Sequence, residues 1–231
     1  MEVSVEELKH KKQFEENMEK KRQKSLADYQ NMFCDYVHLP QIKIIIERFK
    51  YFQDISDLFD IFTTRFDSYT YQQNQRFKES IIWKGEENGS LYSTTTKLPV
   101  SASKNKYLFI LDMNNTTNKI MGIGFIKNLL AKEQELHVYD NPCFNNYIYK
   151  SQYYLSLVDN NILPQNSKSS ISDFIIDEFE QHLFFGKSHL KRGGGYTRFP
   201  YKWLKFKHLR FLLTLFAIHN PNNFNSVVLG L

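Results

Sequence analysis

Residues 186–210, GKSHLKRGGGYTRFPYKWLKFKHLR, combine the residue types that bind anions. The segment contains eight Lys or Arg, two His, two Tyr and one Trp, and it contains no Asp or Glu. Its three consecutive glycines let the backbone approach a ligand and can turn successive N–H groups toward an anion. Lysine, arginine and unpaired backbone N–H groups are common protein ligands of phosphate. The pattern therefore indicates a surface that holds phosphate groups.

We predict that this segment binds the phosphate backbone of a nucleic acid. The next helix is expected to begin at Pro200 and to direct the positive end of its dipole toward the loop. Tyr196 and Phe199 have two interpretations: they stack on bases, or they hold the loop against the core. A flexible basic loop without a ligand, and a different anionic partner, are the alternatives. The residues predicted to contact nucleic acid are Lys187, His189, Lys191, Arg192, Gly193, Gly194, Gly195, Tyr196, Arg198 and Lys202.

The positive charge of the chain is concentrated at its C-terminal end. Residues 181–231 contain eight Lys or Arg and no Asp or Glu, whereas residues 1–180 contain 22 basic and 25 acidic side chains. This asymmetry favours a polyanionic partner, either nucleic acid or an anionic membrane surface. The longest apolar run, residues 211–218, is much shorter than the about 20 residues that cross a bilayer, so no membrane span is predicted.

The two cysteines, Cys34 and Cys143, are far apart and have no neighbouring Cys or His at the spacing of metal ligands. They are interpreted as free thiols of a reducing compartment. The charged N-terminus lacks the features of a signal peptide. We therefore expect an intracellular protein of the cytoplasm, the nucleus or a virion, with no metal site and no cofactor.

The apolar pattern predicts an α+β fold with three regions. Residues 1–38 form a charged helical extension, and two roles stay open for residues 1–30: a solvated arm, or a helix that docks to a protein partner. Residues 39–76 form a helical region, and residues 77–231 form an α+β domain whose basic loop and last helix span 186–219. The helices are predicted at 40–52, 54–62, 173–185 and 200–219.

From about residue 79 onward, short segments rich in β-branched and aromatic residues alternate with polar turns. Residues 110–124 predict a hairpin, because Asn114, Asn115 and Asn118 in its turn can adopt positive φ. Gly122 and Gly124 indicate a bulge or a bend in its second strand. The pattern predicts a small curved sheet or a partly closed barrel. The predicted strands are SIIWK (80–84), SLYSTTT (90–96), KYLFILDM (106–113), KIMGIGFIKN (119–128) and YIYKSQYYLSL (147–157).

Four residues of this strand region could form a pocket for one nucleobase. Trp83 and Tyr92 would supply aromatic surfaces for stacking, and Asp112 and Asn114 would supply polar groups for the base edge. The alternative is that Trp83 is an ordinary core residue.

The order of Trp83, LYSTTTKLP (91–99) and KYLFILDMNNTTNKIMGIGFIKN (106–128) resembles the PUA-like superfamily, in particular its YTH and EVE branches. The similarity covers residues 77–160. It implies a small barrel that reads modified or flipped bases, with Trp83 as one wall of an aromatic cage and Asp112 or Asn114 at its rim. The further cage tryptophans of the YTH pattern are absent, since the only other Trp is Trp203. The Asn-rich and Tyr-rich composition also resembles open reading frames of large DNA viruses.

Two functional hypotheses follow from these features. The first is non-catalytic binding of RNA or DNA, with the basic loop on the phosphates and a base near Trp83. The second is a structural or interaction protein of the virion type, whose N-terminal helix docks to a protein partner and whose basic end neutralises nucleic acid without specificity. The only enzymatic hypothesis retained is a metal-dependent nuclease that uses Asp112 with the acids at 177–180.

Overall fold

The computed structural model describes residues 5–82, 89–99, 106–130, 136–158, 168–192 and 195–220. Its strands are β1 (Phe59–Phe66), β2 (Ser90–Thr94), β3 (Tyr107–Asn114), β4 (Lys119–Leu130), β5 (Tyr147–Ser156) and β6 (Thr197–Arg198). Within the described residues they form one open sheet in the order β2-β5-β4-β3-β1-β6. β1 and β3 are parallel, and the other neighbours are antiparallel.

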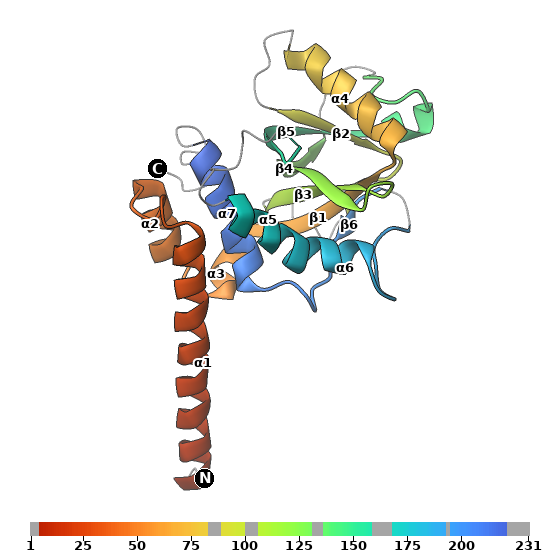
Figure 1. The fold of residues 1–231 in the computed structure, drawn as a ribbon. Coiled ribbons are helices and arrows are strands. Elements are labelled where there is room, and N and C mark those ends of the chain that lie inside the picture. Colours follow the sequence, from red (N-terminus) through yellow and green to blue (C-terminus); the bar gives the residue numbers. More distant parts are fainter. Residues whose placement is uncertain are drawn as a thin grey trace.

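Helices lie on both faces of this sheet, so the predicted α+β class is confirmed (Figure 1). The described helices are α1 (Val5–Met32), α2 (Pro40–Arg48), α3 (Phe52–Ser56), α4 (Ser68–Ile82), the short 3₁₀ helix η1 (Pro142–Asn145), α5 (Lys168–Ile175), the π-helical stretch η2 (Ile176–Glu180), α6 (Gln181–Phe184) and α7 (Phe206–His219). Helix α4 covers one face, whereas α5, α6 and α7 lie on the other (Figure 1). The long helix α1 projects from the body (Figure 1).

Strand β3 is buried on both faces, which explains its nearly unbroken apolar sequence. Side chains alternate between the faces of a strand, so Phe109, Leu111 and Met113 point toward α7 and belong to the larger hydrophobic cluster. Leu108 and Ile110 point toward α4 and belong to a second cluster. The sheet therefore separates the large core from this second cluster and from a third cluster, Phe66, Val138 and Tyr139, which packs against Tyr71 and Phe77 of α4.

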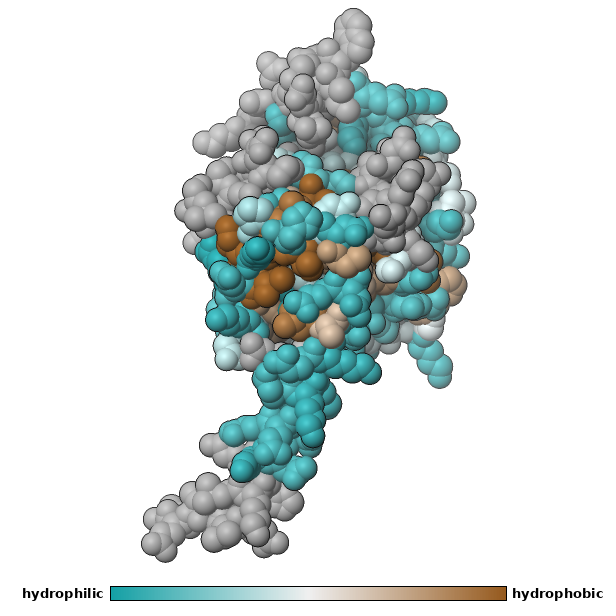
Figure 2. All heavy atoms as spheres, turned by 60° about the vertical axis from the view of Figure 1, so that its left-hand side comes forward, coloured by the Kyte–Doolittle hydropathy of each residue, from teal (hydrophilic) through white to brown (hydrophobic). Residues whose placement is uncertain are grey.

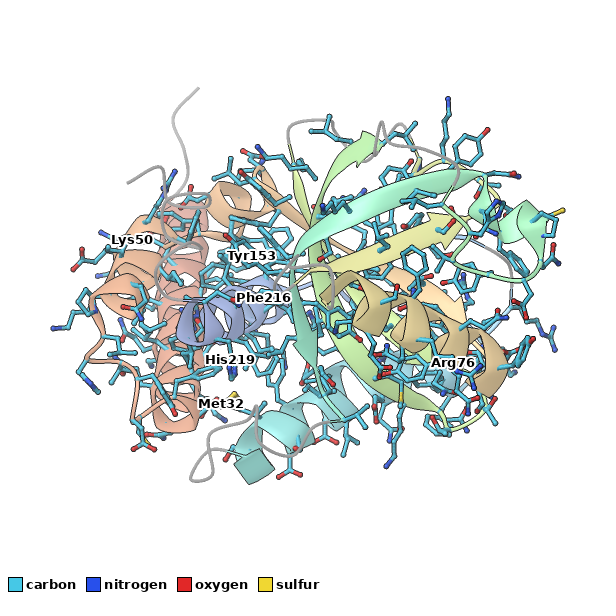
Figure 3. The ribbon with its side chains drawn as sticks, turned by 90° about the horizontal axis from the view of Figure 1, so that it is seen from above. Met32, Lys50, Arg76, Tyr153, Phe216 and His219 are labelled. Atoms are coloured by element: carbon cyan, nitrogen blue, oxygen red, sulfur yellow. The ribbon has the colours of Figure 1, made fainter. Side chains whose placement is uncertain are left out.

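Helix α7 occupies the centre of the larger core, where residues 208–217 are buried without interruption. Leu209, Leu213 and Phe216, spaced at three and four residues along the helix, belong to this core. The helix contacts α1, α2, α3 and β1. Seen from above, α7 lies between the N-terminal helices and the sheet (Figure 3). It is the element that joins the two ends of the chain.

The predicted hairpin is confirmed as β3 and β4, joined by a turn at residues 115–118. Asn118 adopts the left-handed conformation with φ of 56°. The Asn114 side-chain oxygen accepts hydrogen bonds from the backbone N–H groups of Thr116 and Thr117 at 3.0 and 3.2 Å. Asparagine stabilises such turns because its short side chain replaces a backbone acceptor.

Two predictions of secondary structure are wrong. The helix predicted at 54–62 is the short helix α3 followed by strand β1, because a strand covered on both faces shows no alternation and resembles a helical apolar run. The strand predicted at 80–84 falls on the end of α4 and on residues outside the described ranges.

The start of α4 carries a cap: the Asp67 carboxylate accepts a hydrogen bond from the Thr70 backbone N–H at 2.7 Å.

Two predicted helix starts also differ from the structure. The helix predicted at 173–185 begins earlier, at Lys168, and continues through α5, η2 and α6 before Gly186, which has φ of 78°. The last helix begins at Phe206 and not at Pro200, and His208 Nδ1 accepts the Lys205 backbone N–H at 3.0 Å there. The positive end of its dipole therefore lies farther along the chain than predicted.

The strand predictions for β2 to β5 hold, and the sheet is open between β2 and β6 within the described residues. β1 comes from the region that was predicted to be helical, and it lies between β3 and β6 in the same sheet. Cys34 and Cys143 are free and exposed. None of the described helices is both long enough and apolar enough to cross a membrane.

The two strand glycines make room for tyrosine rings on the α4 side. A methyl group at Gly124 would overlap the hydroxyl and ring of Tyr92, and one at Gly122 would overlap the hydroxyl of Tyr154. On β4, Met121 and Gly122 together face the single residue Asp112 of β3, which is a β-bulge as predicted from the glycines.

We expect Gly124→Ala to lower the free energy of unfolding by about 1–3 kcal/mol, because the added methyl group overpacks a buried site. The measurement is denaturant unfolding followed by circular dichroism. In a Tyr92→Ala background the same exchange should cost much less, since the clashing ring is gone. An equal cost in both backgrounds would show that the tyrosine is not the reason for the glycine.

Candidate functional site

The predicted phosphate-binding loop is anchored by one arginine that the sequence did not single out. The guanidinium of Arg65, on β1, donates to the carbonyl of Leu190, to the carbonyl of Gly195 at 3.4 Å and to the hydroxyl of Thr197 at 2.8 Å. Burial lowers the pKa of Arg65 from its usual value. One half-buried side chain thus binds both ends of the loop. The signal in the sequence was the single cation within the apolar strand FDIFTTRF.

The β3–β4 turn anchors the same loop from a second direction. The Asn115 amide donates to the Lys191 carbonyl at 3.0 Å, and the Lys191 ammonium donates to the Asn118 side-chain oxygen at 2.7 Å. His189 Nδ1 accepts the Lys191 backbone N–H at 3.3 Å. The asparagines of the turn therefore have a tertiary role as well as a local one.

The basic residues of the C-terminal segment divide into two groups. Arg198 pairs with the buried carboxylate of Asp60 at 2.8 Å, and Lys207 pairs with Glu178. Arg210 is buried and lies 4.3 Å from the centre of the Tyr29 ring. With Lys191 bound to the turn, these four stabilise the fold. The exposed group is Lys187, Arg192, Lys202 and Lys205.

The aromatic residues of the loop face the protein interior. Tyr196 and Phe199 are both buried, which corresponds to the second of their two predicted roles, holding the loop against the core. Gly195 has φ of 68°, and a side chain there would overlap the Thr96 hydroxyl just after β2. Gly193 and Gly194, which were predicted to contact phosphate, lie outside the described residues.

Three of the four predicted pocket residues lie on the α4 side of the sheet, and one is outside the described ranges. Tyr92 and Asp112 are fully buried, and Asn114 is buried with its side chain used in the turn. Trp83 lies outside the described residues. The Tyr92 ring centre is 6.4 Å from that of Tyr196. The structure therefore brings residues of the predicted loop and of the predicted pocket into contact.

Asp112 is the centre of a buried cluster of oxygen atoms. The hydroxyls of Tyr154 and Tyr92 lie beside its carboxyl group, and both favour the charged form of that group. The geometry of these contacts is imperfect, and neither the carboxyl oxygens nor the two hydroxyls have a well-aligned hydrogen bond to any other described group. Buried polar atoms without partners are uncommon in folded proteins. The cluster is therefore a candidate for contact with a polar ligand.

The charge of this cluster is set by burial. Burial raises the pKa of Asp112 to about 7, against the smaller lowering effects of Tyr154, Tyr92 and the charge of Lys78. The Lys78 ammonium of α4 lies 3.3 Å from the centre of the Tyr154 ring. Burial also raises the pKa values of Tyr92, Tyr154 and Tyr196 well above 10, so these phenols stay neutral.

The carboxylates required by the nuclease hypothesis do not converge. Glu178 binds Lys207 and His208, and Glu180 accepts the Ile120 backbone N–H at 2.8 Å. Among the described residues, no three His, Cys, Asp or Glu side chains are placed to hold a metal ion.

Comparisons of the chain with protein-family models, with curated proteins and with solved structures found no match. The function is therefore argued from the residues and their geometry.

We expect Asp112 to make the free energy of unfolding fall as the pH rises from about 4 to about 7. In this range the unfolded chain has lost the Asp112 proton and the folded protein keeps it, so a rising pH favours unfolding. Asp112→Asn removes this effect. Relative to the wild type, the variant should gain about 2–4 kcal/mol between pH 4 and pH 8, measured by urea unfolding.

His208 acts in the opposite sense and is present in both proteins. Burial lowers its pKa to about 4, so its contribution to stability is present above pH 6.5 and lost as the pH falls toward 4. The comparison of variant with wild type cancels it. Asp177→Asn, at an exposed position of η2, is the matched control. A pH profile of Asp112→Asn that is parallel to the wild type would contradict the assignment.

Proposed function

We propose that the protein binds nucleic acid without catalysing a reaction on it, and that residues 186–205 hold the phosphate backbone. The observation that carries the proposal is the anchored basic loop. Its backbone is fixed by Arg65 and by the Asn115–Asn118 turn, while Lys187 and Arg192 remain exposed. A loop with fixed ends loses less conformational entropy on binding than a flexible one.

The exposed cations suit a polyanion better than a small anion. Lys187 and Arg192 lie in the anchored loop, and Lys202 and Lys205 lie in the turn that leads to α7. No described acidic residue forms an ion pair with any of the four, whereas Arg198 and Lys207 are neutralised within the fold. Separate exposed cations match the repeated charges of a nucleic acid backbone, and each contact releases a counterion.

The buried cluster supports the second part of the proposal, that a base is read on the α4 side of the sheet. A carboxyl group with a pKa of about 7 is protonated in a large fraction of molecules at neutral pH, so it can donate as well as accept. Tyr92 and Tyr196 offer further neutral hydroxyls. Donors and acceptors of this kind match the Watson–Crick edge of a base. Trp83, the proposed aromatic wall of this pocket, lies outside the described residues.

The resemblance to PUA-like domains belongs to this proposal. What supports it is the β3–β4 hairpin within the similar residues, and the contact of Tyr92, on the edge strand β2, with Tyr196, which directly precedes the edge strand β6. The open sheet is compatible with a partly closed barrel only if these edges are joined by side chains.

The alternative class, an interaction protein, is favoured by one observation on α1. Phe14 and Met18 have exposed fractions of 65% and 51% on a helix that projects from the body (Figure 1). Exposed apolar side chains on a projecting helix are typical of a contact surface. In this class of protein, the basic residues of the C-terminal segment would neutralise nucleic acid without base specificity. Base preference separates the two classes.

We expect Lys187→Ala with Arg192→Ala to weaken binding and to reduce its salt dependence. Each lost phosphate contact lowers the slope of log affinity against log salt by about 0.7–0.9, so two contacts lower it by about 1.4–1.8. The measurement is fluorescence anisotropy of labelled single-stranded RNA and DNA at several salt concentrations.

The matched control is Lys43→Ala with Arg76→Ala, which removes the same two charges from exposed positions of α2 and α4. Arg76 lies at the opposite end of the molecule from the N-terminal helices (Figure 3). Equal loss of slope in both double variants would mean that the net charge, and not this loop, governs binding. No binding at low salt would overturn the proposal.

We expect Asp112→Asn to change the preference among oligonucleotides of different base composition while the salt slope stays unchanged. The loss should be roughly five- to tenfold for the preferred sequence, the equivalent of one hydrogen bond. Competition binding with homopolymers measures it, after unfolding data confirm that the variant is folded. A wild type without any base preference would favour the interaction class instead.

A further inference from the structure

The projecting part of α1, residues 12–21, is an exposed helical stalk. Every side chain from 12 to 21 is exposed, and burial begins with Leu26 and Tyr29, which pack against the main core. In Figure 2 this helix is a hydrophilic stalk, with apolar atoms gathered on the body above it. Helices that lack tertiary contacts are only marginally stable in water. A partner that packs against the stalk would therefore add to its stability.

The charges of the stalk are arranged in blocks of opposite sign. Residues 13–19, QFEENME, contain three Glu and no Lys or Arg, whereas residues 20–24, KKRQK, contain four Lys or Arg and no acid. A block of one sign beside a block of the other is self-complementary when two identical helices lie antiparallel. In that arrangement the acidic block of each helix faces the basic block of the other.

An apolar groove opens beside these blocks. It has a volume of about 580 Å³ and lies between α1, the α2–α3 corner and the start of α7. Its apolar lining is formed by Met18, Leu26, Ile46, Phe49, Phe52 and Phe206. Four of its other lining residues are the cations Lys21, Lys50, Lys205 and Arg210, against one acid, Glu47. The groove therefore suits an apolar side chain carried on an acidic segment.

The stalk itself carries such a segment. Met18 lines the groove, and Phe14 lies one helical turn before it on the same side of α1. Glu15, Glu16 and Glu19 surround these two apolar residues in the sequence. The occupant that fits the groove by charge and by shape is therefore present in every copy of the chain.

We propose that two copies of this chain form a dimer through antiparallel α1 helices, with a two-fold axis near Met18. The axis places Glu15 of each copy opposite Lys21 of the second copy, because both residues lie three positions from Met18 on its face of the helix. Phe14 of the second copy then lies beside the groove next to Lys21 and Ser25. The contact is isologous: the same residues serve on both sides, as closed two-fold dimers require.

The test is sedimentation equilibrium of the full chain in the absence of nucleic acid. The wild type should show a mass of twice the 27.6 kDa of one chain. Phe14→Ser with Met18→Ser should give a monomer, because both apolar contacts are lost. Far-ultraviolet circular dichroism checks that the body stays folded.

Charge-reversal variants test whether Glu15 of one copy faces Lys21 of the second copy. Glu15→Lys and Lys21→Glu, each alone, should raise the dissociation constant of the dimer by roughly tenfold or more, because both symmetric pairs become repulsive. The dissociation constant of the double variant with both changes should return to within about threefold of the wild-type value. Each pair again joins one acidic and one basic residue, with the two charges exchanged. Glu79→Lys, at an exposed position of α4, is the matched control and should leave the dimer unchanged.

Two results would overturn the inference: a wild type that is monomeric at every concentration, or a dimer that Glu15→Lys does not weaken. The first would leave the groove to a different partner, and the second would place the dimer contact elsewhere. Both results are independent of the nucleic-acid proposal, which is measured at the loop of residues 186–205.

Discussion

The packing of α7 against the inner strands of the sheet is the interaction on which the rest of the structure depends. Residues 208–217 of this helix are buried without a break, and the helix contacts α1, α2, α3 and β1. Burial of that length of apolar helix joins the ends of the chain into one core. Because α7 must lie inside, the basic segment before it has to run along the sheet edge at β6. Its position at the surface is a consequence of the core.

This path explains why the basic residues have unequal roles. A buried or half-buried cation is costly unless it is paired, so the cations nearest the core bind Asp60, Glu178 or ring faces. The cations that lie farther from the core stay exposed, and they are the ones proposed to meet phosphate. Arg65 links the two groups, since its half-buried guanidinium fixes the backbone that presents the exposed cations.

On the α4 side of the sheet, glycines make room for the rings and hydroxyl groups of tyrosines. Glycine at 122 and 124 leaves space for the hydroxyl ends of Tyr154 and Tyr92, and these reach the carboxyl group of Asp112. Burial then keeps the phenols neutral and leaves a large fraction of the acid protonated at neutral pH. Neutral donors and acceptors held beneath a basic loop form the combination that the proposed nucleic-acid function needs.

The sequence by itself determined the elements whose signals are local. These are the Asn-rich turn, the hairpin, helices α1 and α2, and the core positions of α7, because turn chemistry and helical periodicity depend on near neighbours. It did not determine β1, whose burial on both faces hides the strand period, nor the part of Arg65 in the loop. It also could not show which cations were already paired, since Asp60 and Arg198 are far apart in the chain. Only the tertiary structure decided those points, because burial and ion pairing are set by residues that folding alone brings together.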